Sequence, residues 1–198
     1  MTALAIIDSG GANIASLRYA LERLGCYATL TRDPDVVRTA GRVLLPGVGA
    51  AADAMQRLRA SGLAEVIPTL TQPLLGICLG MQLLFDSSEE GDTSCLGVIS
   101  GRARRLAAAP GRPVPHMGWN QLESTRPHPL MRGVKDGDYA YFVHSYALPA
   151  GAATIATCEY GQSLSAAVSH RNFHATQFHP ERSAGVGATV LQNFLELA

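Results

Sequence analysis

Short apolar runs alternate with amphipathic stretches in the first half of the chain. Residues 3–8 form a continuous apolar run, which predicts a strand buried on both faces. Similar runs predict further strands at 26–31, 43–45 and 74–77. Helices are expected at 14–24, after the Asp33-Pro34 start signal, and at 50–60. This βαβα pattern predicts an α/β fold with a mostly parallel central sheet and helices on both faces.

The second half of the chain has strand signals with few helices between them. These signals fall at residues 97–106, 138–147, 153–160, 163–170 and 173–178. We expect them to form an antiparallel strand extension of the sheet, closed by a final helix over 184–197 with Ser183 as its cap. Because no repeat or linker divides the sequence, residues 1–198 are expected to form a single domain.

Composition narrows the range of partners. Hydrophobic residues make up 47% and charged residues 16% of the 198 residues, and the formal net charge is zero. With no strongly basic cluster, nucleic acid and anionic membranes are not expected as partners. No apolar run approaches the roughly 20 residues that span a bilayer. A signal-peptide pattern is absent and none of the four cysteines is spaced as CxxC, so we expect a cytoplasmic, reducing setting.

The chain also lacks the common cofactor signatures. The histidines show no metal-ligand spacing such as HExxH, and Gly10-Gly11 belongs to neither a GxGxxG motif nor a P-loop. We therefore expect no metal and no cofactor.

The segment Gly76-Ile77-Cys78-Leu79-Gly80 carries the clearest chemical signal. A cysteine between two glycines, where a buried strand meets an amphipathic stretch, is the cysteine counterpart of a nucleophile elbow. Small residues on both sides let strand and helix approach, and a helix N-terminus favours thiolate over thiol. The alternative is that Cys78 is a small buried hydrophobic residue.

A cysteine nucleophile needs a base, and the base needs a group that orients it. Among the six histidines, His179 begins the sequence His179-Pro180-Glu181. Proline favours extended geometry in the residue before it, and residues two apart in an extended chain project to the same side. Glu181 could then bond one ring nitrogen while the other faces the thiol. Alternatively, Glu181 only favours the N-terminus of the last helix and His179 is a loop residue.

An attacked amide also needs donors for its oxyanion. The backbone N–H of Leu79, directly after the cysteine, is one candidate. The turn Pro46-Gly47-Val48-Gly49 offers others, because glycine can direct peptide N–H groups toward a ligand. This turn could equally be a plain connection between strand and helix.

Two segments together resemble class I, triad-type glutamine amidotransferases: residues 76–82, GICLGMQ, and residues 177–181, QFHPE. The segments PGVG at 46–49, HMGWN at 116–120 and YFVHSY at 141–146 narrow the likeness to the glutaminase subunits of imidazole glycerol phosphate synthases, a family of histidine biosynthesis. The resemblance runs from residue 4 to the C-terminus.

The resemblance implies a glutaminase reaction. Cys78 would attack the side-chain amide of L-glutamine, His179 would protonate the departing ammonia and later activate water, and Glu181 would orient His179. The residues that hold glutamine or complete the oxyanion hole would be Gly47, Val48, Gly49, Leu79, Gln82, Glu90, Ser145 and Tyr146.

The resemblance also implies a partner. Ammonia would pass to a (β/α)₈-barrel cyclase subunit in a heterodimer, where it is used to form imidazole glycerol phosphate and an aminoimidazole carboxamide ribonucleotide. The residues at that interface or at the ammonia exit would be Asn13, Met117, Trp119, Asn120, Tyr141 and His144. Core packing is the alternative for Trp119, the single tryptophan. A peptide flip at residues 47–49 would link partner binding to activity.

One segment departs from the family pattern. Where the family has Asp-Tyr-Gly-x-Gly-Asn, residues 8–13 read DSGGAN, so the tyrosine and the second glycine are lost. Three other functions fit the motifs: the glutaminase of another class I amidotransferase (for anthranilate, GMP or pyridoxal phosphate synthesis), a cysteine hydrolase of the same fold, and a non-catalytic binding subunit.

Overall fold

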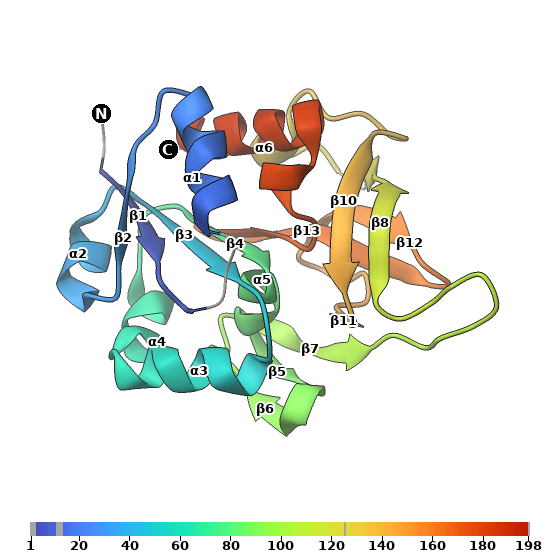
Figure 1. The fold of residues 1–198 in the computed structure, drawn as a ribbon, viewed down its shortest axis with the longest axis horizontal. Coiled ribbons are helices and arrows are strands. Elements are labelled where there is room, and N and C mark those ends of the chain that lie inside the picture. The colour runs from blue at the N-terminus through green and yellow to red at the C-terminus, as the bar shows by residue number, and fades with distance from the viewer. Residues whose placement is uncertain (1–2, 11–13, 125, 198) are drawn as a thin grey trace.

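An eight-stranded sheet runs through the centre of the molecule, in the strand order β2-β1-β3-β4-β14-β13-β12-β9 (Figure 1). The computed structural model describes residues 3–10, 14–124 and 126–197. Five neighbouring strands are parallel: β2 (Ala28–Thr31), β1 (Leu4–Ile7), β3 (Arg42–Gly47), β4 (Leu74–Cys78) and β14 (Phe173–Thr176). The antiparallel strands are β13 (Ser163–His170), β12 (Thr154–Glu159) and β9 (Glu123–Ser124). The predicted α/β fold with a mostly parallel sheet is confirmed.

Helices cover both faces of this sheet, as predicted. Along β1 the side chains alternate between two hydrophobic clusters: Leu4 and Ile6 belong to one cluster, Ala5 and Ile7 to the other. The first cluster is completed by α1 (Ile14–Arg23) and α6 (Ala184–Glu196). The second is completed by α2 (Pro34–Thr39), α3 (Ala51–Ala60), α4 (Leu63–Val66) and α5 (Leu79–Leu83). Figure 1 shows α1 and α6 above the sheet and α3 and α4 below it.

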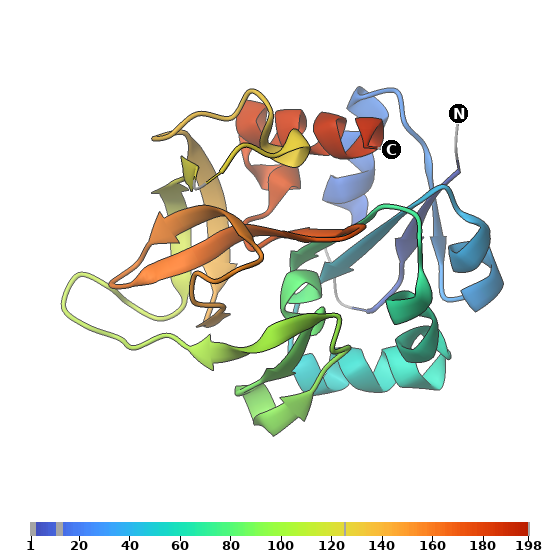
Figure 2. The same ribbon diagram turned by 180° about the vertical axis from the view of Figure 1, so that it is seen from behind.

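The second half of the chain differs from its prediction. Residues 97–106 and 138–147 do not extend the main sheet. Instead β7 (Ile99–Arg105) joins β5 (Phe85–Ser88), β6 (Thr93–Ser94) and β11 (Tyr146–Ala147) in a small sheet, which lies on the same side as α3 (Figure 2). β8 (His116–Gln121) and β10 (Tyr139–His144) form a separate two-stranded ribbon.

The burial patterns explain these differences. β7 is mostly exposed, and every second residue of β10 reaches solvent, so neither strand suits a sheet that is covered on both faces. β14 is buried at all four positions and pairs in parallel with β4, whereas an antiparallel strand was expected. The antiparallel extension therefore consists of β13, β12 and β9 alone.

Of the two residues predicted to cap helices, Asp33 does so and Ser183 does not. Asp33 caps α2, because its Oδ1 accepts the N–H of Asp35 at 2.8 Å. Ser183 precedes α6 but makes no side-chain cap bond. Its Oγ accepts the N–H of Tyr141 at 2.9 Å and donates to the carbonyl of His179 at 2.7 Å. The Ser183 hydroxyl thus connects β10 to the His179 segment instead of capping the helix.

The described residues also form four short helical turns. They are of the 3₁₀ type: η1 (Ile67–Thr69), η2 (Glu90–Asp92), η3 (Pro129–Met131) and η4 (Pro180–Arg182). Within the described ranges, no helix has the length and apolar character needed to cross a bilayer.

The backbones of β3, β4 and α5 touch one another at three glycines. A Cβ atom on Gly80 would lie 1.8 Å from the carbonyl oxygen of Leu45, and one on Gly76 would lie 2.8 Å from the carbonyl oxygen of Gly80. A Cβ on Gly47 would lie 2.9 Å from the nitrogen of Gly80. Because these neighbours are backbone atoms, which cannot rotate aside, only glycine fits. This contact brings the end of β4 directly against the start of α5.

We predict that Gly80→Ala lowers the free energy of unfolding by about 3 kcal/mol or more, because the added methyl group overlaps a carbonyl in the core. Gly185→Ala is the matched control, since its Cβ position in α6 has no described atom within 4 Å apart from its chain neighbours and the backbone of its own helix. The control should raise the free energy of unfolding by about 0.5–1 kcal/mol. Urea unfolding measures both, and equal stabilities would contradict the close packing at Gly80.

Candidate active site

A cavity of about 320 Å³ opens beside the carboxyl ends of β3 and β4. This is the edge of a parallel sheet where ligands usually bind. Most of the residues that the sequence singled out for catalysis and glutamine binding meet here. The cavity is lined by Val48, Gly49, Cys78, Leu79, Gln82, Glu90, Pro115, Val143, His144, Ser145, Tyr146 and His179.

Cys78 sits at the junction of β4 and α5 in an unusual backbone conformation. Its φ is 55° and its ψ is −109°, a region that L-residues rarely adopt. Such a conformation costs on the order of 1–3 kcal/mol and persists only where the surrounding structure enforces it. Here the close packing at Gly76 and Gly80 enforces it. The conformation turns the thiol toward the cavity at a sharp corner, as the elbow motif predicts.

The Cys78 sulfur has two polar neighbours besides histidine. Sγ lies 3.7 Å from the carbonyl oxygen of Val143 and 3.7 Å from Nε2 of Gln177. Gln177 is fully buried, and the Nε2 of Gln82 donates to its Oε1 at 3.0 Å. Gln177 belongs to the QFHPE motif but was not predicted as a site residue, although its place two residues before His179 was a signal that it lies close to the site.

Gln82 has its amide nitrogen fully engaged. Nε2 donates to the carbonyl oxygen of Tyr146 at 2.8 Å as well as to Gln177. An amide nitrogen has two protons, so only Oε1 of Gln82 is left to meet a ligand in the cavity. Glu90 is also held, because its Oε2 accepts the N–H of Ala51 at 2.8 Å at the start of α3.

His179 and Glu181 form a buried pair. Nδ1 of His179 lies 2.8 Å from Oε1 of Glu181, and both side chains are more than nine-tenths buried. His179 is extended, with φ −93° and ψ 99°, as Pro180 requires. The expected extended geometry does not continue, however, because Glu181 lies in the 3₁₀ turn η4. The carboxylate reaches the ring through a tight turn, since the effect of proline on the chain ends at the preceding residue.

The surroundings of His179 favour its charged form. Burial by itself lowers the pKa of His179, but hydrogen bonding to the Cys78 sulfur and the Glu181 carboxylate outweighs burial and raises the pKa to about 10. The contact between Nε2 and the sulfur falls short of regular hydrogen-bond geometry, since the buried Nε2 has no hydrogen-bond partner of such geometry among the described residues. The arrangement brings a protonated imidazole next to a thiol, with a carboxylate behind it.

A pair of histidines, His116 and His144, lies beside the cavity, and His144 lines it. Nδ1 of His144 lies 2.9 Å from the carbonyl oxygen of Tyr146, so this nitrogen must carry a proton. Its Nε2 then accepts from Nδ1 of His116 at 3.0 Å, and Nε2 of His116 faces the Asn120 amide at 3.3 Å. Burial lowers the pKa of His144 to about 3 and that of His116 to about 4. Both imidazoles are therefore neutral at pH 7.

The glycine turn after β3 borders the same cavity. Val48 and Gly49 line it, and Gly49 has a φ of +92° that favours glycine. Gly47 lies behind them, packed against Leu79 and Gly80. The carbonyl of Pro46 accepts a hydrogen bond from the buried Ser9 hydroxyl at 2.7 Å, which ties the turn to the segment after β1.

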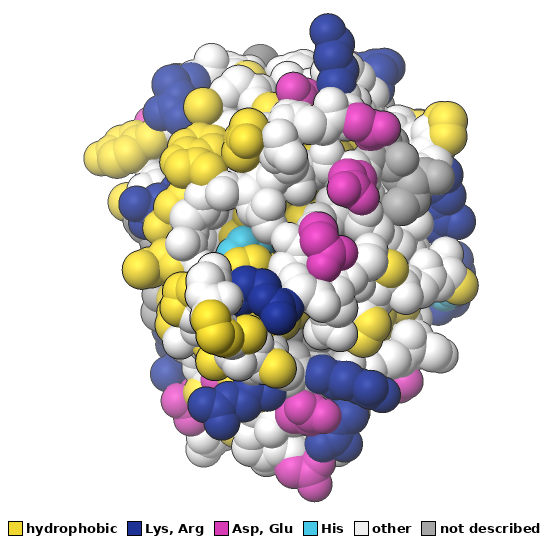
Figure 3. All heavy atoms as spheres, turned by 90° about the vertical axis from the view of Figure 1, so that its right-hand side faces the viewer, with side chains coloured by type: hydrophobic (Ala, Val, Ile, Leu, Met, Phe, Trp, Pro, Cys, Tyr) yellow, Lys and Arg dark blue, Asp and Glu magenta, His cyan; other side chains and the backbone are white. Residues whose placement is uncertain are grey.

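The residues predicted to contact a partner lie mostly on the β8–β10 ribbon. Met117 and Trp119 are exposed, with 53% of Trp119 accessible, so core packing does not explain the tryptophan. Tyr141 packs edge-on against Trp119, with ring centroids 6.1 Å apart. Asn120 donates to the carbonyl of Glu159 at 2.9 Å. We call Met117, Trp119, Tyr139 and Tyr141 the aromatic ribbon surface. Figure 3 shows the face of the molecule on this side, where hydrophobic side chains gather beside a hollow.

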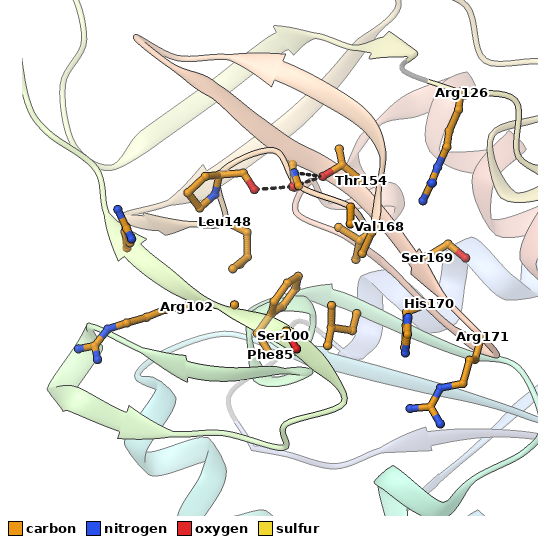
Figure 4. A pocket seen from close by; sticks show the side chains of 18 residues that line it. Phe85, Ser100, Arg102, Arg126, Leu148, Thr154, Val168, Ser169, His170 and Arg171 are labelled. Carbon is orange, nitrogen blue, oxygen red and sulfur yellow. Dashed lines mark hydrogen bonds between the residues drawn. The ribbon is translucent and has the colours of Figure 1, made fainter.

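The remaining predicted residue, Asn13, lies outside the described residues. A larger cavity of about 690 Å³ contains none of the predicted residues (Figure 4). It is lined by arginines such as Arg102 and Arg126 over an apolar floor, and no cysteine or carboxylate borders it. In the described part of the chain, no group of three His, Cys, Asp or Glu side chains could hold a metal ion.

Residues 5–197 match the family described as "Glutamine amidotransferase class-I". The chain belongs to the class I glutamine amidotransferases.

Individual relatives show which kind of class I amidotransferase the chain resembles. The chain is 54% identical to imidazole glycerol phosphate synthase subunit HisH of Xanthomonas campestris pv. campestris (strain 8004) over 198 residues, which cover 100% of this chain and 99% of that one. It is 54% identical to the same-named subunit of Xylella fastidiosa (strain Temecula1) over 197 residues, covering 100% of this chain and 98% of that one. The structure of PurLQS from Thermotoga maritima shares the fold, with a TM-score of 0.75, 18% identity and 99% of each chain covered. The family resemblance that the motifs indicated is confirmed.

The raised pKa of His179 leads to a testable expectation. In an NMR titration, the imidazole of wild-type His179 should remain protonated well above pH 6.5. Glu181→Gln removes the carboxylate that favours the charged ring, so the His179 pKa should fall in this variant. Glu65→Gln makes the same chemical change at an exposed residue of α4 and should leave the titration unchanged. A wild-type His179 that titrates at or below pH 6.5 would contradict this electrostatic description.

Proposed function

We propose that this chain is the glutaminase subunit of an imidazole glycerol phosphate synthase, and that residues 1–198 act as one glutamine amidotransferase domain. It would hydrolyse L-glutamine to glutamate and ammonia through Cys78, His179 and Glu181. The observation that carries the proposal is the buried His179–Glu181 pair, 2.8 Å apart, whose histidine lines one cavity together with the strained Cys78. Identity of 54% to HisH subunits along the whole chain supports this choice over other class I members.

In the first half of the reaction, the Cys78 thiolate attacks the amide carbon of glutamine. The carbonyl electrons move onto oxygen, where the N–H of Leu79 and a peptide N–H of the Val48–Gly49 turn would stabilise the oxyanion. The His179 imidazolium then gives its proton to the amide nitrogen, the C–N bond breaks, and ammonia leaves. The product on the enzyme is a glutamyl thioester on Cys78.

In the second half, His179 is neutral and takes a proton from water. The oxygen of that water attacks the thioester carbon, the C–S bond breaks, and the product leaves as glutamate after its new carboxyl group has lost its proton to solvent. The Cys78 thiolate and the His179 imidazolium are thereby restored. Throughout both halves, Glu181 holds Nδ1 of His179, so that Nε2 stays directed at the reacting atoms.

The rest of the cavity would hold the amino and carboxylate groups of glutamine. Oε1 of Gln82 and the carboxylate of Glu90 are acceptors suited to the α-ammonium group. Ser145 and Tyr146 also line the cavity. The volume of about 320 Å³ is sufficient for one amino acid and ordered water.

Ammonia must leave this cavity unprotonated to remain a nucleophile. His144 lines the cavity and is neutral, because burial lowers its pKa to about 3, so it offers no proton to ammonia. We propose that the exit lies on the His144 side, toward the aromatic ribbon surface. A cyclase subunit with a (β/α)₈-barrel would dock there, with Asn13 and Asn120 at the interface. It would use the ammonia to form imidazole glycerol phosphate and an aminoimidazole carboxamide ribonucleotide.

The proposed setting is the cytoplasm, and no cofactor is proposed. All four cysteines are free, including the buried Cys78 and Cys158. Free thiols are typical of reducing compartments, where a cysteine nucleophile stays active.

We predict that Cys78→Ala lowers glutamine hydrolysis by at least about 10³-fold, since the nucleophile is lost. The assay measures glutamate release with and without a cyclase subunit and its nucleotide ligand. Cys95→Ala is the matched control: burial raises the pKa of the Cys95 thiol to about 11, so this thiol is not expected to react. Turnover that survives in Cys78→Ala would refute the proposed chemistry.

The aromatic ribbon surface gives a second prediction. Trp119→Ala should weaken binding of the cyclase subunit by about 30-fold or more, as expected when a central aromatic of an interface is removed. Tyr27→Ala is the control, because Tyr27 is 78% exposed but lies before β2 at the other end of the sheet. Titration calorimetry compares the two; equal affinities would place the docking surface elsewhere.

A further inference from the structure

Gln177 is a buried polar residue for which the triad chemistry has no role. It directly follows β14, and its own N–H donates to the carbonyl of Ala166 at 2.8 Å. Its side chain is fully buried beside the nucleophile, with Nε2 3.7 Å from Sγ of Cys78. A buried amide is unfavourable unless both its oxygen and its nitrogen find partners, so the identity of those partners shows what the residue can do.

The hydrogen-bond network fixes which end of the amide faces the sulfur. The carbonyl oxygen of Tyr146 can only accept, so the Gln82 atom 2.8 Å from it must be the nitrogen, Nε2. This nitrogen has a second proton, directed at Gln177 at 3.0 Å, and the atom of Gln177 that receives it must be Oε1. Nε2 of Gln177 is then the atom next to Sγ. Reversing either amide would bring two acceptors or two donors together.

The sulfur therefore has one acceptor and one donor at equal distances. As a thiol, it can donate its proton to the carbonyl of Val143 at 3.7 Å. As a thiolate it has no proton to give, and of these two partners only the N–H of Gln177 can interact favourably with it, in addition to the charged His179 ring. Hydrogen bonds to an ionised group are stronger than those between neutral groups. The two partners thus favour different protonation states of the same atom.

We propose that Gln177 donates a hydrogen bond to the Cys78 thiolate and that Gln82 is the positioning residue that directs this donor. The proposal rests on the proposed function in one respect, that Cys78 reacts as a thiolate. The Gln177 donor would stabilise the sulfur before attack on glutamine and again when the thioester releases it. Gln82 would contribute chiefly through Gln177, with only its Oε1 available to the substrate.

The test is the pH profile of Cys78 alkylation by iodoacetamide in the full chain, followed by mass spectrometry. In Gln177→Met, which keeps the size but lacks the donor, the pH of half-maximal rate should rise by about one unit, a tenfold shift. Gln82→Met should give a smaller shift in the same direction, because the Gln177 amide loses its orientation. These variants keep the other ionisable groups around the sulfur: His179 and Glu181 from the η4 side, His144 from β10 and Glu90 from η2.

Asn193→Leu is the matched control. Asn193 is another buried amide, which donates to the carbonyls of Leu130 and Arg132 at 3.0 and 2.7 Å, away from the cavity. Its loss should lower stability without moving the alkylation profile.

An unchanged profile in folded Gln177→Met would overturn the proposal, and so would an equal shift in Asn193→Leu. If Gln177→Met does not fold, Gln82→Met decides the question by the same criterion. Since alkylation needs neither glutamine nor a cyclase, the result is independent of whether the chain proves to be a glutaminase.

Discussion

The contact between the backbone of Gly80 and the carbonyl of Leu45 is the constraint on which the site depends. It brings α5 against β3 at a distance that no side chain permits. Cys78 is thereby held at φ 55°, at an expected cost on the order of 1–3 kcal/mol. Each fully buried Leu or Ile of the surrounding sheet contributes about 1.5–3 kcal/mol, so a few residues such as Ile6 and Leu44 offset that strain.

The same packing connects the nucleophile to the base. His179 follows β14, the strand next to β4, so the pairing of these two strands brings residues 78 and 179 to one edge of the sheet. The His179 segment is then bonded to β10: its N–H donates to the carbonyl of Tyr141 at 2.9 Å, and Ser183 bridges the Tyr141 N–H to the His179 carbonyl. A partner that shifts the ribbon carrying Trp119 would have to move or break these bonds. The catalytic base and the proposed docking surface are thus mechanically linked.

Features that depend on local sequence could be predicted. Apolar runs identified the parallel strands β1, β3 and β4, and the glycines around Cys78 identified the elbow, because these signals reflect contacts within a few residues. Asp33 could be assigned as a cap for the same reason. The positions of most site residues around one cavity agree with the motifs that singled them out.

Features that depend on distant partners could not be predicted. The parallel pairing of β14 with β4 joins segments about a hundred residues apart, and no local pattern specifies it. The Ser183 hydroxyl is taken by Tyr141 and His179, where sequence alone suggested a helix cap. The orientation of the Gln177 amide depends on a hydrogen bond from Gln82, 95 residues earlier in the chain. Glu181 was predicted correctly as a neighbour of His179, but the extended conformation predicted for this segment was wrong, because Glu181 lies in the turn η4.

We propose above all that the sulfur of the strained Cys78, at the end of β4, is the atom that reacts with glutamine. The most direct measurement is covalent trapping with the diazoketone analogue of L-glutamine, followed by peptide mapping in a mass spectrometer. The account predicts a single adduct on Cys78 that excess L-glutamine prevents. Inactivation with the adduct on Cys26, Cys95 or Cys158, and none on Cys78, would contradict it.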